Sequence, residues 1–308
     1  MENLSFILEK LKGKKDSFNG DYFIPKMWNS FNFTNYSNDS VRYDEMKLNP
    51  YEFISDCIEK IIKNSSGKGS ISSSTASDVS LESSVIYCLF PRMLTAWNHY
   101  DNNLCSGTFL KTICMLPYLK KMNVNLVYLL PIFKYSLSNR KGDTGSPYSI
   151  KNIYQLDENL HDNLLGDFNS EILETEFKAF VEACHLLGIK VMVDFVFRTV
   201  ARDSDLIIEH PDWFYWINLE CKNSFCAPKI EGIKAQTVVS EKLVPKIYSS
   251  RNVSDYLKQF TYSPKDIDQK KWLSLVDRYK TSGGNILELI EEEFKITTAP
   301  GFSDVIND

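Results

Sequence analysis

The 308-residue sequence has no long apolar run and no excess of charge of one sign. Its longest apolar stretch, residues 124–133, is interrupted by Asn125 and Pro131 and falls well short of the roughly 20 residues that a membrane-spanning helix needs. Residues 1–12 lack the basic start, apolar middle and cleavage site of a secretory signal. We therefore expect no membrane span and a cytoplasmic protein.

The distribution of charges does not indicate nucleic-acid binding, and the spacing of the cysteines does not indicate a disulfide framework. There are 35 basic and 40 acidic residues, giving a net charge of -5 without a long block of either sign, so nucleic acid is not an expected partner. The seven cysteines have no regular spacing, and we expect reduced, structural thiols, with Cys88, Cys114 and Cys184 packed in apolar segments. Cys221 and Cys226 are close enough to pair or hold a metal, but they lack neighbouring ligands.

The composition and the periodicity of apolar residues change along the sequence. Residues 1–64 include an amphipathic segment, 51–63, whose apolar side chains recur at helical spacing. The Ser-rich run 65–84 has almost nothing to bury and is typical of a linker. From residue 85 onward, short apolar runs alternate with amphipathic helical segments. We therefore expect an N-terminal helical region (1–64), a linker (65–84) and an α/β region (85–196).

The α/β region predicts strands at 85–90, 124–130 and 189–196, with helices near 109–122 and 171–187 between them. Strands that alternate with helices in this way form a parallel sheet. Three strands alone do not distinguish an open doubly wound sheet from a closed barrel. Residues 197–308 lack regular alternation, although 272–279 and 285–294 have helical periodicity.

The segments after the three predicted strands carry aromatic and polar side chains together: 91–102, 131–162 and 197–217. Functional residues of parallel α/β folds lie at these strand ends. Flat aromatic rings stack on the C–H faces of sugars while amides and charges bind hydroxyls, so the composition favours a carbohydrate site. Asn98 and His99 lie in the first of these segments, where a cleft position and a surface loop are both open.

At these segments the sequence resembles the α-amylase superfamily, glycoside hydrolase family 13. The run DFVFRT (194–199) is similar to the family's D-x-V-x-N-H motif at the end of the third barrel strand, with Arg198 and Thr199 in place of Asn and His. The run SPYS (146–149) is similar to the loop whose Tyr supports the sugar beside the cleaved bond. Among family members, the likeness is greatest to bacterial maltosyltransferases, through KGD…SPYS (141–149), RTVARDSDLIIEHPDWFYWI (198–217) and APGFSDVIND (299–308).

The resemblance implies the first three βα units of a (β/α)8 barrel, with an inserted subdomain over 197–308. It implies α-1,4-glucans and malto-oligosaccharides as substrates, retaining transfer of maltosyl units and no cofactor. Tyr148 would be the sugar platform, Asp194 would bind in the donor cleft, and Lys141, Arg198, Asn98 and His99 would line it. A cation at position 198 would repel calcium, so no metal is expected. The aromatic residues 213–216 are expected to pack the start of the inserted subdomain.

The resemblance also implies that the catalytic carboxylates lie beyond residue 308. Retaining transfer needs two carboxyl groups about 5 Å apart, and residues 200–308 contain no G-x-R-x-D segment of the kind that carries the nucleophile. The 308 residues alone are then expected to be inactive. The alternatives are a non-catalytic glucan-binding fragment and one half of a split enzyme. The expected protein partner is a C-terminal half chain or a second copy in a homodimer. A transferase that uses maltose-1-phosphate is the alternative enzyme, although its motif at 198–199 ordinarily differs.

Overall fold

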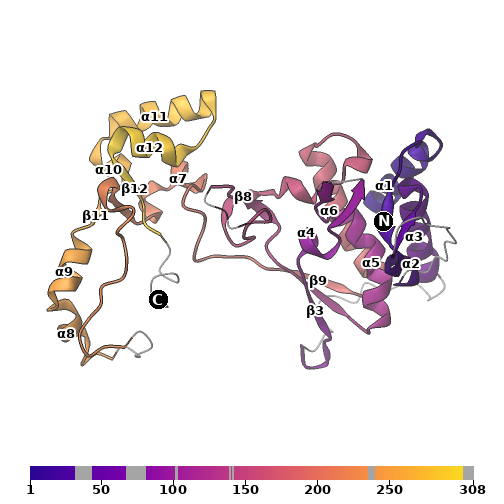
Figure 1. Cartoon of the computed structure of the whole chain (residues 1–308), viewed down its shortest axis with the longest axis horizontal. Coiled ribbons are helices and arrows are strands. Elements are labelled where there is room, and N and C mark those ends of the chain that lie inside the picture. Colours follow the sequence, from indigo (N-terminus) through magenta and orange to yellow (C-terminus); the bar gives the residue numbers. More distant parts are fainter. Residues whose placement is uncertain are drawn as a thin grey trace. The chain divides into compact units, whose positions relative to one another are not determined.

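The computed structural model describes residues 1–31, 44–66, 81–100, 103–138, 140, 142–234 and 240–300. The chain divides into two compact units (Figure 1). The first unit contains residues 1–134 and 154–196, and the second contains 135–153 and 197–308. The segment 135–153, which carries Tyr148, therefore belongs to the same unit as the region expected to form an inserted subdomain.

The centre of the first unit is a parallel sheet of β3 (Ile86–Leu89), β6 (Leu126–Leu129) and β9 (Lys190–Val193), in the order β3-β6-β9. Helix α5 (Phe109–Lys121) connects the first two strands, and α6 (Ser170–Leu186) precedes the third. All five elements lie within a few residues of their predicted positions, so the α/β prediction is confirmed for this unit.

One face of the sheet is buried under helices and the other is open. Tyr87, Val127 and Val191 occupy one cross-strand row and pack into the main hydrophobic cluster with α5 and α6. The opposite face includes Ile86, which is 52% exposed, and Met192, which is 40% exposed. Cys88 is on this open face and is exposed, so the expectation that it packs as a buried thiol is wrong. Cys114 and Cys184 are buried as expected.

The N-terminal helices form a further layer on the same core. Helix α1 (Glu2–Lys14) packs against α3 (Pro50–Ser66) and α6, while α3 also packs against α5. The predicted stripe of α3 is buried, including Phe53, Ile58 and Ile61. Asn3 and Leu4 donate to the Glu182 carboxylate at the start of α1, which ties this helix to α6. The remaining elements of the unit are η1 (Lys15–Ser17), β1 (Phe23–Pro25), α2 (Lys26–Phe31), β2 (Glu45–Lys47), η3 (Leu81–Ser83), α4 (Pro91–Leu94), β4 (Trp97–Tyr100), β5 (Asn103–Cys105), η4 (Glu158–Leu160) and η5 (Asn163–Leu165).

Two short strands connect the units in sequence. Strands β7 (Phe133–Tyr135) and β8 (Ile150–Leu156) form a two-stranded sheet, and the chain passes from one unit to the other within both strands. Between them lies the segment that carries the SPYS run.

The second unit is built on a small antiparallel sheet. Its strands β10 (Trp216–Asn218), β11 (Phe260–Thr261) and β12 (Ile296–Thr298) lie in the order β11-β10-β12. Trp216 and Ile296 pack with α7 (Leu206–Glu209), α11 (Gln269–Ser282) and α12 (Ile286–Phe294) in a separate hydrophobic cluster. The two helices predicted at 272–279 and 285–294 are thus confirmed. The other elements are η6 (Pro211–Trp213), η7 (Leu219–Cys221), α8 (Val244–Tyr248), α9 (Arg251–Leu257) and α10 (Pro264–Ile267).

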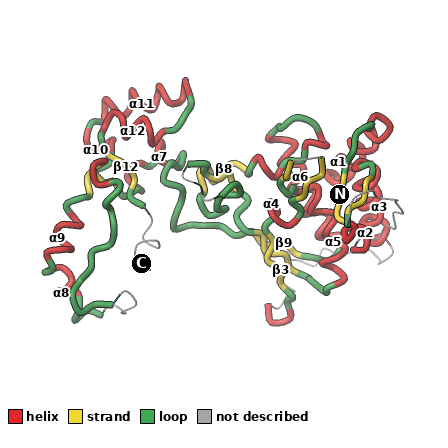
Figure 2. Tube along the Cα trace, viewed as in Figure 1, coloured by secondary structure: helices red, strands yellow, loops and turns green. Residues whose placement is uncertain are grey.

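Long loops account for much of the second unit, as the green trace between β10 and α8 in Figure 2 shows. Cys221 and Cys226 lie in this part of the chain as free thiols. Over the described residues, no helix is long and apolar enough to cross a membrane.

Candidate functional site

The carboxyl ends of β3, β6 and β9 point to the same edge of the parallel sheet, and Asp194 lies there. Its backbone N–H donates to Leu129 O of β6 (2.8 Å), which extends the β6–β9 ladder by one residue. Asp194 follows Met192 by two residues and therefore shares the open face of the sheet. A half-buried carboxylate in this position faces the space in which a barrel would hold its substrate.

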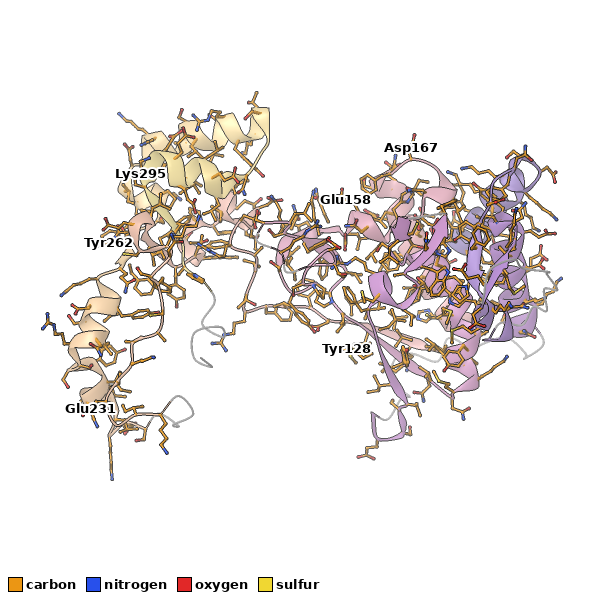
Figure 3. All side chains as sticks on the ribbon, in the orientation of Figure 1. Tyr128, Glu158, Asp167, Glu231, Tyr262 and Lys295 are labelled. Atoms are coloured by element: carbon orange, nitrogen blue, oxygen red, sulfur yellow. The ribbon has the colours of Figure 1, made fainter. Side chains whose placement is uncertain are left out.

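The Tyr128 phenol lies near enough to the Asp194 carboxylate to interact with it. Tyr128 lies in β6 opposite Met192, and its interaction with Asp194 is the main cause of the raised pKa of its phenol, because the carboxylate stabilises the protonated form. Figure 3 labels Tyr128. Tyr128 was not singled out from the sequence, since a Tyr in an apolar strand is usually a packing residue.

Asn98 and His99 lie in β4, beyond the end of β3. The His99 ring is fully buried, stacks on Tyr22 with centroids 4.6 Å apart, and its Nδ1 lies 2.8 Å from Phe23 O. Burial lowers the pKa of His99 to about 4, so its ring is neutral at neutral pH. In this structure His99 packs the N-terminal region onto β4. Asn98 is half-buried in the same strand.

A buried polar cluster lies at the N-terminus of α5 and against α6. Thr108, the N-cap residue of α5, donates to Asp162 Oδ2 (2.7 Å), and Lys111 Nζ lies 3.5 Å from the same oxygen. The Asp162 N–H donates to Glu176 Oε2 (3.1 Å), and His161 Nδ1 lies 2.5 Å from Glu176 Oε1. These bonds fix the segment 157–166 against the starts of the helices, so the cluster stabilises the strand-end loops.

Tyr148 lies in the second unit, in the loop between β7 and β8. It is 43% exposed, and its N–H donates to Ser146 Oγ (3.2 Å) in a turn closed by Ser149 N–H to Ser146 O (3.2 Å). The base of the loop is closed by Ser136 N–H to Ser149 O (2.8 Å). Gly145 has a φ of +63°, a backbone conformation that favours glycine. The loop therefore presents the Tyr148 ring partly to solvent on a hydrogen-bonded turn.

The segment 201–205 anchors the Tyr148 loop. Asp203 accepts from Ser138 Oγ (3.0 Å) and lies 3.6 Å from Lys151 Nζ, while Asp205 accepts from Asn152 (3.0 Å). Arg202 donates twice to Thr298 O, at 3.1 and 2.7 Å, and so links this segment to β12. From the sequence, residues 202–205 were noted only as part of the segment that resembles maltosyltransferases. The structure shows that they anchor the loop.

Arg198 is exposed and lies three residues before the segment 201–205. Lys141 lies outside the described residues. The predicted residues are thus distributed over both units, with Asn98, His99 and Asp194 in the first and Tyr148 and Arg198 in the second. Over the described ranges, no group of three or more His, Cys, Asp or Glu side chains is arranged to hold a metal ion.

Comparison with known proteins identifies the chain's relatives. The family described as alpha amylase, catalytic domain, matches residues 63–271. The α-1,4-glucan:maltose-1-phosphate maltosyltransferase of Cereibacter sphaeroides is 37% identical over 123 residues, which cover 36% of this chain and 19% of that protein. The enzyme of the same name from Mycolicibacterium smegmatis is 33% identical over 138 residues, covering 42% of this chain and 18% of that protein.

Among solved structures, an α-amylase from Lactobacillus plantarum is similar over 43% of this chain and 26% of its own, with 32% identity and a TM-score of 0.34. A noncanonic maltogenic α-amylase from Thermotoga neapolitana is similar over 70% of this chain and 37% of its own, with 23% identity and a TM-score of 0.33. The chain spans less than a fifth of the length of the curated relatives.

Proposed function

Because the chain belongs to the α-amylase family, whose catalytic-domain model matches residues 63–271, we propose that it forms the first part of an α-1,4-glucan maltosyltransferase. Such an enzyme transfers maltosyl units to α-glucans with retention of configuration. The observation that carries this proposal is the family match together with the maltosyltransferase names of relatives that are 33–37% identical. The expected substrates are α-1,4-glucans and malto-oligosaccharides.

By the resemblance, Tyr148 in the second unit and Asp194 in the first are each proposed to bind a sugar unit of the glucan. The exposed ring of Tyr148 would stack on the C–H face of a glucose unit. The Asp194 carboxylate would accept hydrogen bonds from sugar hydroxyls. By the resemblance, Arg198, Asn98 and Lys141 are each proposed to donate to sugar hydroxyls, and Lys141 to limit the transferred unit to two sugars.

The buried His99 is not proposed to contact sugar. Its ring is held between β1 and β4 and contacts Tyr22 and Phe23, so the proposal gives it a packing role in place of the expected sugar contact. A side chain with no solvent exposure in this structure would reach a sugar only after β4 moved.

Two compounds are candidates for the maltosyl donor. The resemblance favours a glucan donor, because Arg198 and Thr199 match the segment of glucan-dependent maltosyltransferases. The curated relatives instead carry the name of enzymes that use maltose-1-phosphate. Offering maltotetraose and maltose-1-phosphate separately to the protein that contains this chain, with glycogen as acceptor, distinguishes them. Release of inorganic phosphate identifies the second donor.

The chain of 308 residues is proposed to bind glucan without transferring it, because retaining transfer requires the pair of carboxylates that the G-x-R-x-D region and its partner supply. The alternatives are a binding fragment and one half of a split enzyme. Incubating the 308-residue chain with maltotetraose tests this proposal: new oligosaccharides formed in proportion to protein would refute it. The binding role itself is tested with Tyr148→Ala and Tyr148→Phe, since only the alanine variant should lose affinity for maltotetraose.

A further inference from the structure

The exposed aromatic side chains of the second unit include Trp213 (65%), Tyr215 (68%) and Tyr262 (77%), which lie on or beside its small sheet. We call these three residues the aromatic surface. The sequence led us to expect residues 213–216 to pack as a group. The structure buries Trp216 (2% exposed) and half-buries Phe214, but it leaves the other two in solvent.

The alternation follows from the backbone. Phe214 is extended (φ −105°, ψ 143°), and successive side chains of an extended segment point to opposite sides. Phe214 and Trp216 therefore point together into the hydrophobic cluster, with ring centroids 6.4 Å apart. Trp213 and Tyr215 leave the chain on the other side.

Tyr262 lies on the same side as Tyr215. Strands β10 and β11 are antiparallel, with Trp216 opposite Thr261 and Ile217 opposite Phe260. Continuing this register by one residue places Tyr215 opposite Tyr262, a pair whose Cα atoms are then separated by about 5 Å. Figure 3 labels Tyr262 at the end of β11. Two tyrosines and a tryptophan thus share one face of the sheet and its entry segment.

Neighbouring aromatic rings pack against Trp213 and Tyr215. The Trp213 ring stacks on the His210 ring with centroids 3.8 Å apart and an interplanar angle of 5°. The backbone N–H of Trp213 donates to His210 O (3.0 Å). Tyr215 meets the edge of Phe260 at 6.2 Å, and Phe260 in turn packs at 5.2 Å from Tyr256. The rings of Trp213 and Tyr215 are therefore pre-ordered, which reduces the entropy that binding would cost.

We propose that the aromatic surface is a binding site for α-glucan chains, additional to the site at the strand ends. This inference rests on the proposed function, because it takes its ligand from the same class of substrate. Flat, ordered rings exposed to water bind the C–H faces of sugars, and the two phenol groups add hydrogen-bond donors and acceptors for hydroxyls. A polymeric substrate offers sugar units to both sites along one chain, so the surface would raise the local concentration of glucan at the transfer site.

The occupant is assigned as a neutral sugar because of the groups around the rings. Asp212, next to Trp213, and Glu209 are exposed acids, which would repel an anionic ligand. An apolar partner would leave the two phenol hydroxyls to be desolvated. A second copy of this chain is the competing occupant, and the test below measures it directly.

The test measures binding of the 308-residue chain to glycogen and to maltoheptaose by affinity electrophoresis and calorimetry. Variants Trp213→Ala and Tyr215→Ala/Tyr262→Ala are expected to bind glycogen about tenfold more weakly. Tyr248→Ala is the matched control, because Tyr248 is equally exposed (68%) but lies on α8, outside the aromatic surface, and it should bind like the unmodified chain. Cellohexaose should not compete.

The outcomes separate this inference from the proposed function. If Tyr148→Ala weakens binding while the aromatic-surface variants do not, the additional site is refuted and the proposed function stands. If the unmodified chain binds no α-glucan, both are refuted. If the aromatic-surface variants change only the oligomeric state, measured by light scattering, the surface is an interface between copies and the inference is wrong. Circular dichroism and the melting temperature of each variant confirm that it is folded.

Discussion

Arg92 Nε lies 3.0 Å from Asp157 Oδ2, and both side chains are only 5% exposed. Arg92 belongs to the short helix α4 after β3, whereas Asp157 directly follows β8, so this buried ion pair joins two segments that are 65 residues apart in sequence. The guanidinium also lies over the Phe90 ring, 4.9 Å from its centroid. Burial raises the pKa of Asp157, and the charge of Arg92 opposes that shift.

Removing one partner of this pair should strongly destabilise the first unit. Arg92→Met leaves the Asp157 carboxylate buried without its cation, and we expect the free energy of unfolding to fall by about 3 kcal/mol or more. Urea denaturation followed by tryptophan fluorescence measures the loss. The exposed helical pair Lys178 and Glu174 is the control, because Lys178→Met should cost less than about 0.5 kcal/mol. Equal losses from the two variants would contradict the role given to Arg92.

Gly107 is predicted to tolerate no side chain. A Cβ at this position would lie 2.1 Å from Pro91 O and 2.7 Å from Thr95 Oγ1, and the first of these is a backbone atom that cannot rotate away. Gly107→Ala should therefore destabilise the chain by about 2 kcal/mol or force the turn after β3 to shift. Gly13→Ala in α1 is the control: a Cβ there meets nothing within 4 Å, so stability should be unchanged or rise by up to about 1 kcal/mol. A melting temperature unaffected by Gly107→Ala would contradict the close approach of residue 107 to Pro91 O.

The His161–Glu176 pair should make stability fall as the pH rises. Burial raises the pKa of Glu176 to about 7, and the bond to His161 only partly offsets this. Burial alone would lower the pKa of His161, but its bonds to Glu176 and to Gly166 O raise it above the ordinary value. Both groups hold protons more tightly when folded. Their contribution is therefore complete below about pH 4.5 and is lost as the pH passes through about 7.

Glu176→Gln removes the carboxyl group and should flatten this dependence. Between pH 4.5 and 8, the stability of the unmodified chain relative to the Gln variant should fall by an amount on the order of 3 kcal/mol. Denaturation curves at a series of pH values measure the difference. Glu174→Gln, on the exposed side of the same helix, should leave the dependence unchanged. Stability that instead rose with pH relative to the Gln variant would reverse the sign argued here.

The sequence predicted the helices and parallel strands well because each has a local pattern. The stripe of Phe53, Ile58 and Ile61 recurs at helical spacing, and the strands are short apolar runs. It did not predict the long-range polar contacts. The interaction of Tyr128 with Asp194 and the ion pair of Arg92 with Asp157 join residues 65 or more positions apart, and a single sequence contains no signal for them.

The candidate site was predicted in part for the same reason. Tyr148 and Asp194 were found through motifs, and the structure places them on an ordered turn and at a strand end. His99 was selected as a polar residue in a loop, whereas it is buried against Tyr22 from the N-terminal region, which a local reading could not foresee. The exposure of Trp213 and Tyr215 depends on the extended backbone at Phe214, and aromatic composition alone favoured packing.

The open face of the parallel sheet should make the 308-residue chain self-associate. Ile86, Cys88 and Met192 present apolar surface there, although sheets of this kind are normally covered on both faces. Among the described strands, β3 and β9 are both sheet edges, and flat apolar edges recruit other chains. We expect a concentration-dependent increase in mass by light scattering. Ile86→Thr should reduce it, whereas Leu104→Thr, at a 78% exposed position on β5, should not. A monodisperse monomer with a sharp cooperative melt would mean that this face needs no partner.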